Sequence, residues 1–242
     1  DPLPTSPDQL VRMSWQDYAP HYRELLAQDL SASSISAWMT DWTRLRRTWY
    51  EAQQRLYVAN TIDTASAEAE TLLNNFLDEV SPQVQAADQQ VKEKLLASGL
   101  EPPGYSVPLR NLRAEAAFFR QENLTLLSEE LKLSHEHEGI VGAQTVLWNG
   151  TELTLSQLSL VYLDSDRTAR ERAWMLASAR WLEDRQAIGD VWQRSLQLRT
   201  RMAANAGLLD YRSYRWQKQF RFDYTPEDCR TFHSAIESVV VP

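Results

Sequence analysis

The sequence is poor in the residues that interrupt helices and in the residue that forms covalent cross-links. Only seven glycines occur in 242 residues, well below the usual share of about 7%. This shortage, together with abundant alanine, leucine and glutamine, favours helix. A lone cysteine, Cys229, excludes an intramolecular disulfide. A reducing, cytoplasmic setting is therefore the simplest expectation.

The chain also lacks an excess of positive charge and a long apolar run. Its net charge is −8 and its isoelectric point is about 5.1. Such a balance disfavours nucleic-acid binding, because that function uses a clustered basic surface. It also disfavours docking on an anionic membrane. No apolar run approaches the roughly 20 residues of a membrane helix. The polar, proline-rich start, DPLPTSPDQLVRM, predicts no secretion signal. We therefore expect neither nucleic acid nor a membrane as a partner.

Both ends of the sequence suggest that more chain belongs to this protein. The first residue is Asp1 rather than methionine, and the last residues, AIESVVVP, form an apolar run that stops at Pro242. Natural C-termini are usually solvated. We expect a piece of a longer protein, whose exposed apolar surface includes Val239, Val240 and Val241. An isolated monomer with such a surface should behave poorly in solution.

Apolar residues recur at steps of three and four along two long segments of the first hundred residues, which places them on one face of a helix. The first stripe comprises Ile35, Trp38, Trp42, Leu45, Trp49, Ala52, Leu56 and Ala59. The second comprises Ala69, Leu72, Phe76, Val80, Val84, Ala87, Val91 and Leu95. Ser81-Pro82 predicts a kink or a restart in the second helix, because proline lacks the amide donor. Gly99 and the following EPPG end this helix. Residues 1–104 are thus predicted to form a helical hairpin lobe.

The remaining residues, 105–242, predict further helices and one hairpin. A helical region runs from about Val107 to Gly139. In the stretch that follows, apolar and polar residues alternate, and Asn149-Gly150 suits a type I′ turn. A long helix is expected from near Asp166 to Gly207. One of its sides is lined by Trp174, Ala177, Trp181, Ile188, Val191, Ser195, Leu198 and Met202.

The last helix is predicted from its start signal. Thr225 suits an N-cap, Pro226 the first turn, and Glu227 and Asp228 the positive end of the helix dipole. The predicted fold is mainly α, with long antiparallel helices and one small β-hairpin near residues 145–155.

Arginines and tryptophans are dense between residues 167 and 230, where nucleic acids could stack on the rings. Acidic residues are interleaved throughout this region, so we interpret the tryptophans as core residues between helices.

The stretch SHEHEG, residues 134–139, resembles a metal site at first sight. A helical H-E-x-x-H zinc site needs two histidines four residues apart, so that both imidazoles point the same way. His135 and His137 are only two residues apart, which separates them by roughly 200° around a helix. The fourth position after His135 is Gly139. We interpret this stretch as a charged, solvated helix end.

The sequence offers no other candidate site. His21 and His233 each stand alone as imidazoles in their segments, and Cys229 lacks a recognisable nucleophile motif. Motifs for a nucleophile elbow, a phosphate loop or a dinucleotide fold are missing. Asn123 and Asn149 match the glycosylation sequon, and both matches are interpreted as chance. No catalytic, cofactor-binding or metal-binding residue is therefore assigned to this chain.

The order of several short motifs resembles the oligoendopeptidase F branch of the thimet oligopeptidase-like zinc metallopeptidases. The resemblance covers roughly residues 105–242, while residues 1–104 fit as the N-terminal helical lobe of that family. The matching residues are Leu133-Ser134, Trp148-Asn149-Gly150, Asp166-Arg167, Arg170, Ala173, Arg201, Ala204, Gly207, Tyr211 and Tyr214.

This resemblance implies that residues 105–242 are the N-terminal portion of a helical peptidase domain, truncated before the zinc-binding motif. The full-length protein would be a zinc metalloendopeptidase acting on oligopeptides, and this chain would supply the wall and gate of its channel. The zinc and the H-E-x-x-H helix would lie in the missing C-terminal catalytic part, so the chain alone should be inactive. One alternative is a non-catalytic helical binding or scaffold domain. Another is a helical carboxypeptidase or deacylase relative.

Overall fold

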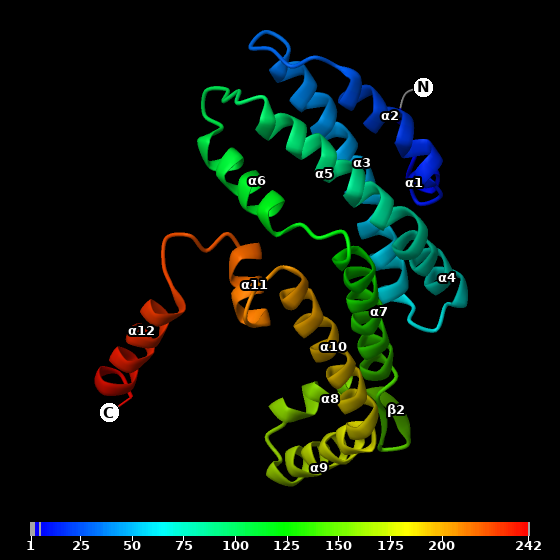
Figure 1. Cartoon of the computed structure of the whole chain (residues 1–242). Coiled ribbons are helices and arrows are strands. Elements are labelled where there is room, and N and C mark those ends of the chain that lie inside the picture. Colours follow the sequence, from blue (N-terminus) through cyan, green and yellow to red (C-terminus); the bar gives the residue numbers. More distant parts are fainter. Residues whose placement is uncertain (1–2, 5, 242) are drawn as a thin grey trace.

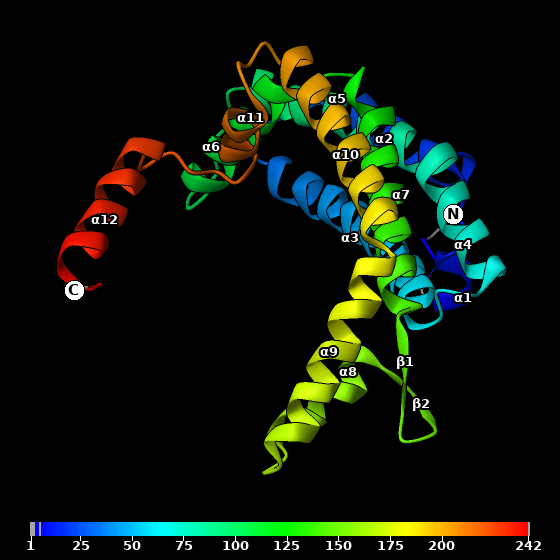
Figure 2. The same ribbon diagram turned by 90° about the horizontal axis from the view of Figure 1, so that it is seen from below.

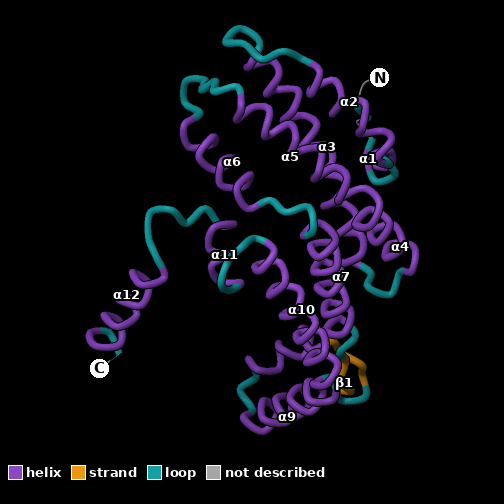
Figure 3. Tube along the Cα trace, viewed as in Figure 1, coloured by secondary structure: helices purple, strands orange, loops and turns teal. Residues whose placement is uncertain are grey.

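The structure is a computed structural model that describes residues 3–4 and 6–241. Helices dominate these residues, and their two strands pair into a small antiparallel sheet (Figures 1 and 3). Seen from below, the helices form an arch, with α12 projecting at one end and α9 at the other (Figure 2). This mainly α architecture confirms the predicted fold class.

The first lobe consists of α1 (Pro7–Leu10), α2 (Trp15–Ala27), α3 (Ile35–Ile62), α4 (Ala67–Asn75), a π-helical turn (Phe76–Val80), α5 (Ser81–Ala97) and α6 (Ser106–Phe118). The second part consists of α7 (Asn123–Gly142), β1 (Thr145–Trp148), β2 (Thr151–Thr154), α8 (Leu155–Leu158), a 3-10 turn (Ser159–Leu163), α9 (Arg167–Glu183), α10 (Arg185–Asn205), α11 (Tyr211–Lys218) and α12 (Pro226–Val239).

The core of the first lobe follows the predicted apolar stripes. Trp38 and Trp42 of α3 are only 1% and 3% exposed, and the indole Nε1 of Trp38 donates to the carbonyl of Leu25 at 2.9 Å. From Phe76 onward the second stripe is buried as well. Leu109 and Leu112 of α6 join this same core. The predicted domain division after residue 104 stays a prediction.

The predicted interruption near Pro82 takes the form of one wide helical turn. A π-helical turn over Phe76–Val80 links α4 to α5, and the amide of Ser81 donates to the carbonyl of Phe76. Proline cannot donate to the carbonyl four residues before it, and its ring clashes with that carbonyl. Widening the preceding turn accommodates the ring, so the helix continues through Pro82 to Ala97.

The helical region predicted over Val107–Gly139 is two helices, which corrects the sequence interpretation. Phe119 is extended (φ −61°, ψ 132°) and separates α6 from α7. The Arg120 guanidinium donates to the carbonyls of Ala117 and Phe119 and to that of Asn205 on α10. These bonds satisfy carbonyls that the end of α6 leaves open, and they stabilise a break that no glycine or proline marks. The second helix continues beyond Gly139 to Gly142.

The long helix predicted from Asp166 to Gly207 is also two helices, α9 and α10, which meet at Asp184. One carboxylate oxygen of Asp184 accepts from Gln144 at 2.9 Å and from Arg180 at 2.7 Å. Gln144 is 2% exposed, so this contact fixes the junction from inside the fold. The predicted end at Gly207 is confirmed, since its φ of 73° is left-handed.

The β-hairpin and the last helix lie where they were predicted. Asn149 and Gly150 have φ values of 50° and 84°, as the turn requires, and Trp148 pairs with Thr151. Thr225 caps α12 by accepting from the amide of Asp228, whose carboxylate accepts from the amide of Thr225 at 2.7 Å. Helix α12 projects from the rest of the chain (Figures 1 and 2).

The prediction that the tryptophans fill the core is wrong for three of them. Trp174, Trp181 and Trp192 are each more than half exposed. Helix α9 instead turns Ala173 and Ala177 toward the hairpin and α8, where the two alanines are 0% and 2% exposed. Small side chains allow the close approach of the helix. Ala177 was a predicted core position and is buried as expected, as are Val191 and Met202 of α10, whereas Ala173 takes the place predicted for Trp174.

The predicted apolar surface near the end of the chain is confirmed for Val239, Val240 and Val241. They are 78%, 72% and 73% exposed, and Phe232 on the same helix is 64% exposed. No residue of α12 between Pro226 and Val239 is buried. Pro242 lies outside the described residues, and poor behaviour of the monomer stays a prediction.

Candidate functional site

The SHEHEG stretch lies within α7 and joins three helices through polar contacts. Nδ1 of His135 lies 3.2 Å from a carboxylate oxygen of Glu138, and the other oxygen of Glu138 accepts from the Tyr57 hydroxyl at 2.9 Å. The rings of Tyr57 and His135 are 5.1 Å apart. Glu136 pairs with Arg194 of α10. These contacts tie α7 to α3 and α10, so the stretch is less solvated than predicted.

The described residues do not fit a zinc centre. Within the described residues, no three or more histidine, cysteine, aspartate or glutamate side chains gather closely enough to hold a metal ion. His21 lies on α2, while Cys229 and His233 lie on α12, far from the histidines of α7 (Figure 1). The assignment of no metal-binding residue stays a prediction, because residues outside the described ones are not covered.

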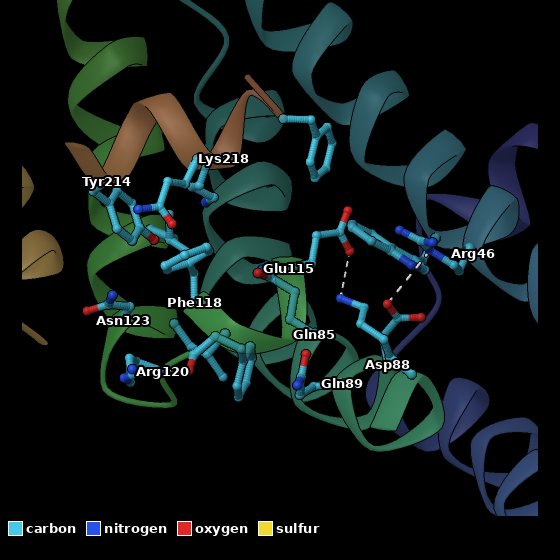
Figure 4. Close-up of a pocket in the computed structure, with 17 residues that line it drawn as sticks. Arg46, Gln85, Asp88, Gln89, Glu115, Phe118, Arg120, Asn123, Tyr214 and Lys218 are labelled. Atoms are coloured by element: carbon cyan, nitrogen blue, oxygen red, sulfur yellow. Dashed lines mark hydrogen bonds and ion pairs between the residues drawn. The ribbon is translucent and has the colours of Figure 1, made fainter. Parts of the chain in front are cut away.

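A cavity of about 270 Å³ lies where the first lobe meets α7 and α11 (Figure 4). Sequence analysis did not identify it. Helices α3, α5, α6, α7 and α11 contribute to its wall, together with the residues that follow α6 and α11. Its lining residues are Arg46, Trp49, Gln85, Asp88, Gln89, Lys92, Glu115, Phe118, Phe119, Arg120, Asn123, Leu124, Leu127, Tyr214, Gln217, Lys218 and Phe220.

Two ion pairs occupy the wall that the first lobe provides. Asp88 accepts from the Trp42 indole at 2.6 Å and lies 3.7 Å from the Arg46 guanidinium. Lys92 and Glu115 pair at 2.7 Å between α5 and α6. Asp88 and Lys92 are each only 7% exposed. Burial raises the pKa of Asp88 above that of an ordinary aspartate, although Arg46 and Trp42 act in the opposite direction.

Two polar atoms of residues around the cavity have no hydrogen-bond partner among the described residues. The side-chain oxygen of Gln89 and the indole Nε1 of Trp49 are both buried and unpartnered. The amide nitrogen of Gln89 donates to Glu93 at 2.7 Å, which fixes the orientation of the carboxamide. An unpartnered buried polar atom costs about 1–3 kcal/mol. The wall of the cavity is therefore partly polar and includes two residues with unpaired, fully buried polar atoms.

The residues that carry the family resemblance have structural roles here. The carboxylate of Asp166 caps α9 by accepting from the amide of Thr168 at 2.8 Å. Arg170 donates to the carbonyl of Asp164 at 2.7 Å. Arg172, which the motif did not include, covers the Trp148 ring at 4.0 Å and fixes the hairpin to α9. Asp166 and Arg170 thus stabilise the start of α9, and Arg172 fixes the hairpin beside it.

A second cluster ties α7, α10 and α11 together around Glu130. Its carboxylate accepts from Arg199 at 2.7 Å and from the Tyr211 hydroxyl at 3.3 Å. Burial raises the pKa of Tyr211, and the negative charge of Glu130 acts in the same direction. Tyr214, the second tyrosine of the motif, is 3% exposed and lines the cavity. The paired tyrosines thus place α11 over the cavity.

Comparison with known proteins identifies the class of this fold. Residues 6–102 match the Peptidase M3 N-terminal domain. This first part of the chain is therefore similar to the N-terminal domain of M3 peptidases. No protein of curated function matches the sequence.

None of the described helices has the length and apolar character that crossing a membrane requires.

Three solved structures extend the match over nearly the whole chain. A candidate oligoendopeptidase F matches 96% of this chain with a TM-score of 0.87 and 18% identity. A second one, from Bacillus anthracis strain Ames, matches 96% with a TM-score of 0.84 and 18% identity. PZ peptidase A, solved with an inhibitor, matches 98% with a TM-score of 0.81 and 21% identity. The chain therefore has the fold of the N-terminal part of an oligoendopeptidase F, which confirms the resemblance.

The chain spans less than half the length of these structures. It covers 42% of the first, 44% of the second and 42% of PZ peptidase A. At identities near 20% the comparison establishes the fold and leaves the chemistry to be argued from the residues.

Proposed function

We propose that this chain is the wall and gate portion of a zinc metalloendopeptidase that hydrolyses short oligopeptides. The observation that carries the proposal is the M3 N-terminal domain over residues 6–102, continued by the oligoendopeptidase fold. Peptide hydrolysis by a metallopeptidase requires a zinc ion and a general base. The described residues do not fit such a centre. We therefore place the H-E-x-x-H motif in a C-terminal catalytic part outside this chain.

The role of the chain in this proposal is to shape access to the catalytic part. Its helices form an arch rather than a compact body (Figure 2). Polar contacts stiffen the connections between the helices. The contact between Asp184 and Gln144 ties the α9–α10 junction to the segment between α7 and β1, and Glu138 ties α7 to α3. A stiff wall of this kind would admit unfolded oligopeptides and exclude folded proteins by size. The proposed substrates are therefore oligopeptides, and the proposed setting is cytoplasmic.

The exposed apolar side chains of the second part support a catalytic part as the partner. Trp174 and Trp181 on α9 and Phe232 on α12 are more than half exposed. Large exposed apolar patches on soluble proteins usually mark interaction surfaces. The first lobe also exposes a few large apolar side chains, such as Tyr50 and Ile62, but its tryptophans on α3 lie in or against one continuous core. In this proposal, the catalytic part packs against the second part of the chain and covers these side chains.

The test compares this chain with the full-length protein on an internally quenched peptide, with and without a chelator. We expect cleavage by the full-length protein, loss of cleavage with the chelator, and no cleavage by residues 1–242 alone. Cleavage that survives chelation would exclude the zinc mechanism. The coding sequence beyond Pro242 provides a second test. If it encodes no two histidines four residues apart on a helix, the scaffold alternative replaces the peptidase.

A further inference from the structure

The tip of the β-hairpin contains a chemically labile pair of residues. Asn149 is one of seven asparagines in the sequence and the only one that a glycine follows. Asparagine is a thermolabile residue, because the backbone nitrogen of the next residue can attack its side-chain amide carbon. Glycine has no Cβ to hinder that nitrogen. Asn149 and Gly150 are both exposed, so water reaches the two residues.

The closed turn of the hairpin holds the two reacting atoms apart. Asn149 and Gly150 have φ values of 50° and 84°, and they form the two-residue loop between Trp148 and Thr151. These values are typical of a type I′ turn, in which ψ of the first residue is about +30°. At that ψ the Gly150 nitrogen lies nearly opposite the Asn149 side chain across the Cα–C bond. The five-membered ring of the intermediate needs both on one side, so the attack requires the turn to open.

One arginine of α9 stabilises the closed turn. The Arg172 guanidinium donates to the side-chain oxygen of Asn149 at 2.6 Å and covers the Trp148 ring at 4.0 Å. The donated bond also draws electrons from the amide carbon, which by itself would favour the attack. Geometry outweighs this effect, because the closed turn keeps the Gly150 nitrogen out of reach of that carbon. Removal of Arg172 should therefore speed up the reaction rather than slow it.

We propose that Asn149 is a site of spontaneous deamidation, and that Arg172 controls its rate by keeping the hairpin closed. When the turn opens, the Gly150 nitrogen loses its proton to the solvent and forms a bond to the side-chain carbon of Asn149, and ammonia leaves. Water then opens the resulting succinimide ring at either carbonyl, which gives aspartate or isoaspartate. The net reaction consumes one water molecule and releases one ammonia molecule, and nothing is oxidised or reduced.

The two products affect the hairpin differently. The aspartate carboxylate replaces the amide to which Arg172 donates, so a neutral acceptor becomes a charged and stronger one. In isoaspartate the main chain runs through the side-chain carbon and is one atom longer. A two-residue loop fixes the register of its hairpin, so the longer loop disturbs the pairing of Trp148 with Thr151. Aspartate should therefore preserve the contact with α9, and isoaspartate should loosen it.

The experiment incubates residues 1–242 in mildly alkaline buffer and follows every asparagine by peptide mass spectrometry, which detects the mass gained when an amide becomes an acid. A synthetic peptide of residues 143–156 gives the rate in an open chain, because an isolated two-stranded hairpin is at best marginally stable. We expect conversion at Asn149 and at none of the other six asparagines. Conversion in the folded chain should be at least about tenfold slower than in the peptide, which corresponds to an opening free energy of about 1.4 kcal/mol.

Two variants and a matched control test the role of Arg172. Arg172→Met should speed up conversion at least about threefold, because it removes the hydrogen bond and the ring contact. Arg172→Lys keeps the charge and should give an intermediate rate. Arg167→Met removes another exposed arginine of α9, which pairs with Glu171 at 3.0 Å, and should leave the rate unchanged. Circular dichroism and the melting temperature check folding, and Arg172→Lys keeps the comparison informative if Arg172→Met unfolds.

Three results would overturn the proposal. The first is no conversion at Asn149 over many half-lives of the peptide, which would mean that the residue is not a modification site. The second is conversion as fast as in the peptide, which would mean that the closed turn gives no protection. The third is an unchanged or slower rate in folded Arg172→Met. These results depend on the hairpin alone, so they are separate from any failure to cleave peptides.

Discussion

Replacing one buried and one exposed tryptophan tests the packing of the two parts directly. Trp38 is 1% exposed in the first lobe, whereas Trp181 on α9 is 53% exposed. We expect Trp38→Ala to destabilise the first lobe by about 3–5 kcal/mol, which is the usual cost of truncating a buried aromatic side chain. The change also leaves the carbonyl of Leu25 without its indole donor. We expect Trp181→Ala to change stability by less than about 0.5 kcal/mol, because its ring is mostly solvated.

Urea unfolding of residues 1–242, followed by far-ultraviolet circular dichroism, measures both variants without relying on tryptophan fluorescence. With an m-value of about 3 kcal/mol/M, the midpoint for Trp38→Ala should fall by about 1–1.7 M. The midpoint for Trp181→Ala should shift by less than about 0.2 M. Equal losses in the two variants, or a larger loss for Trp181→Ala, would refute the packing described here.

Three further predictions concern a cap, a close contact and a buried charge. Thr225→Ala should destabilise α12 by about 1 kcal/mol, seen as faster amide hydrogen exchange in α12 and unchanged exchange in α3. Ala173→Leu should destabilise the second part by about 1–3 kcal/mol through overpacking, while Trp174→Leu, one residue away, should have little effect in the same urea titration. Because burial raises the pKa of Asp88 above the usual 3.8, the folded state disfavours its ionised form. The stability of the wild type relative to Asp88→Asn should therefore fall as pH rises above 3.8, and a rise would contradict this.

The helices of the first lobe could be predicted because large apolar residues mark them at helical spacing. Trp38, Trp42 and Leu45 follow one face of α3, and all three are buried. The hairpin turn and the α12 cap were predictable for a similar reason, since Asn149-Gly150 and Thr225 use local backbone chemistry that few other sequences support. In each case a short segment contains all of the interactions that determine its conformation.

The two helix breaks could not be predicted because distant residues stabilise them. No glycine or proline marks the end of α6 at Phe118, and Arg120 reaches Asn205 of α10 to stabilise the turn. The junction at Asp184 depends on Gln144, which is 40 positions earlier in the chain. Local propensity favours a continuous helix at both places, and the tertiary hydrogen bonds override it.

The cavity was missed for a related reason. Its charged residues come from α3, α5, α6, α11 and the segment after α6, so their proximity appears only in the folded chain. A local signal was nevertheless present: Asp88 lies within the apolar stripe of α5, between Val84 and Val91. A charged residue in a buried stripe needs a partner from elsewhere, and such a position could have been singled out from the sequence.

The two parts of the chain differ in how completely they bury their large side chains. The first lobe places Trp38, Tyr18 and Tyr22 at no more than 1% exposure, around one continuous core. The second part has two small cores, whose buried residues include Ala173 and Met202, and it leaves large aromatic rings on α9, α10 and α12 in solvent. Burying such a ring stabilises a protein by about 1.5–3 kcal/mol. The difference therefore favours the interpretation that another part of the protein covers the exposed rings of the second part. The proposed catalytic part would cover it, while the first lobe would need no such partner.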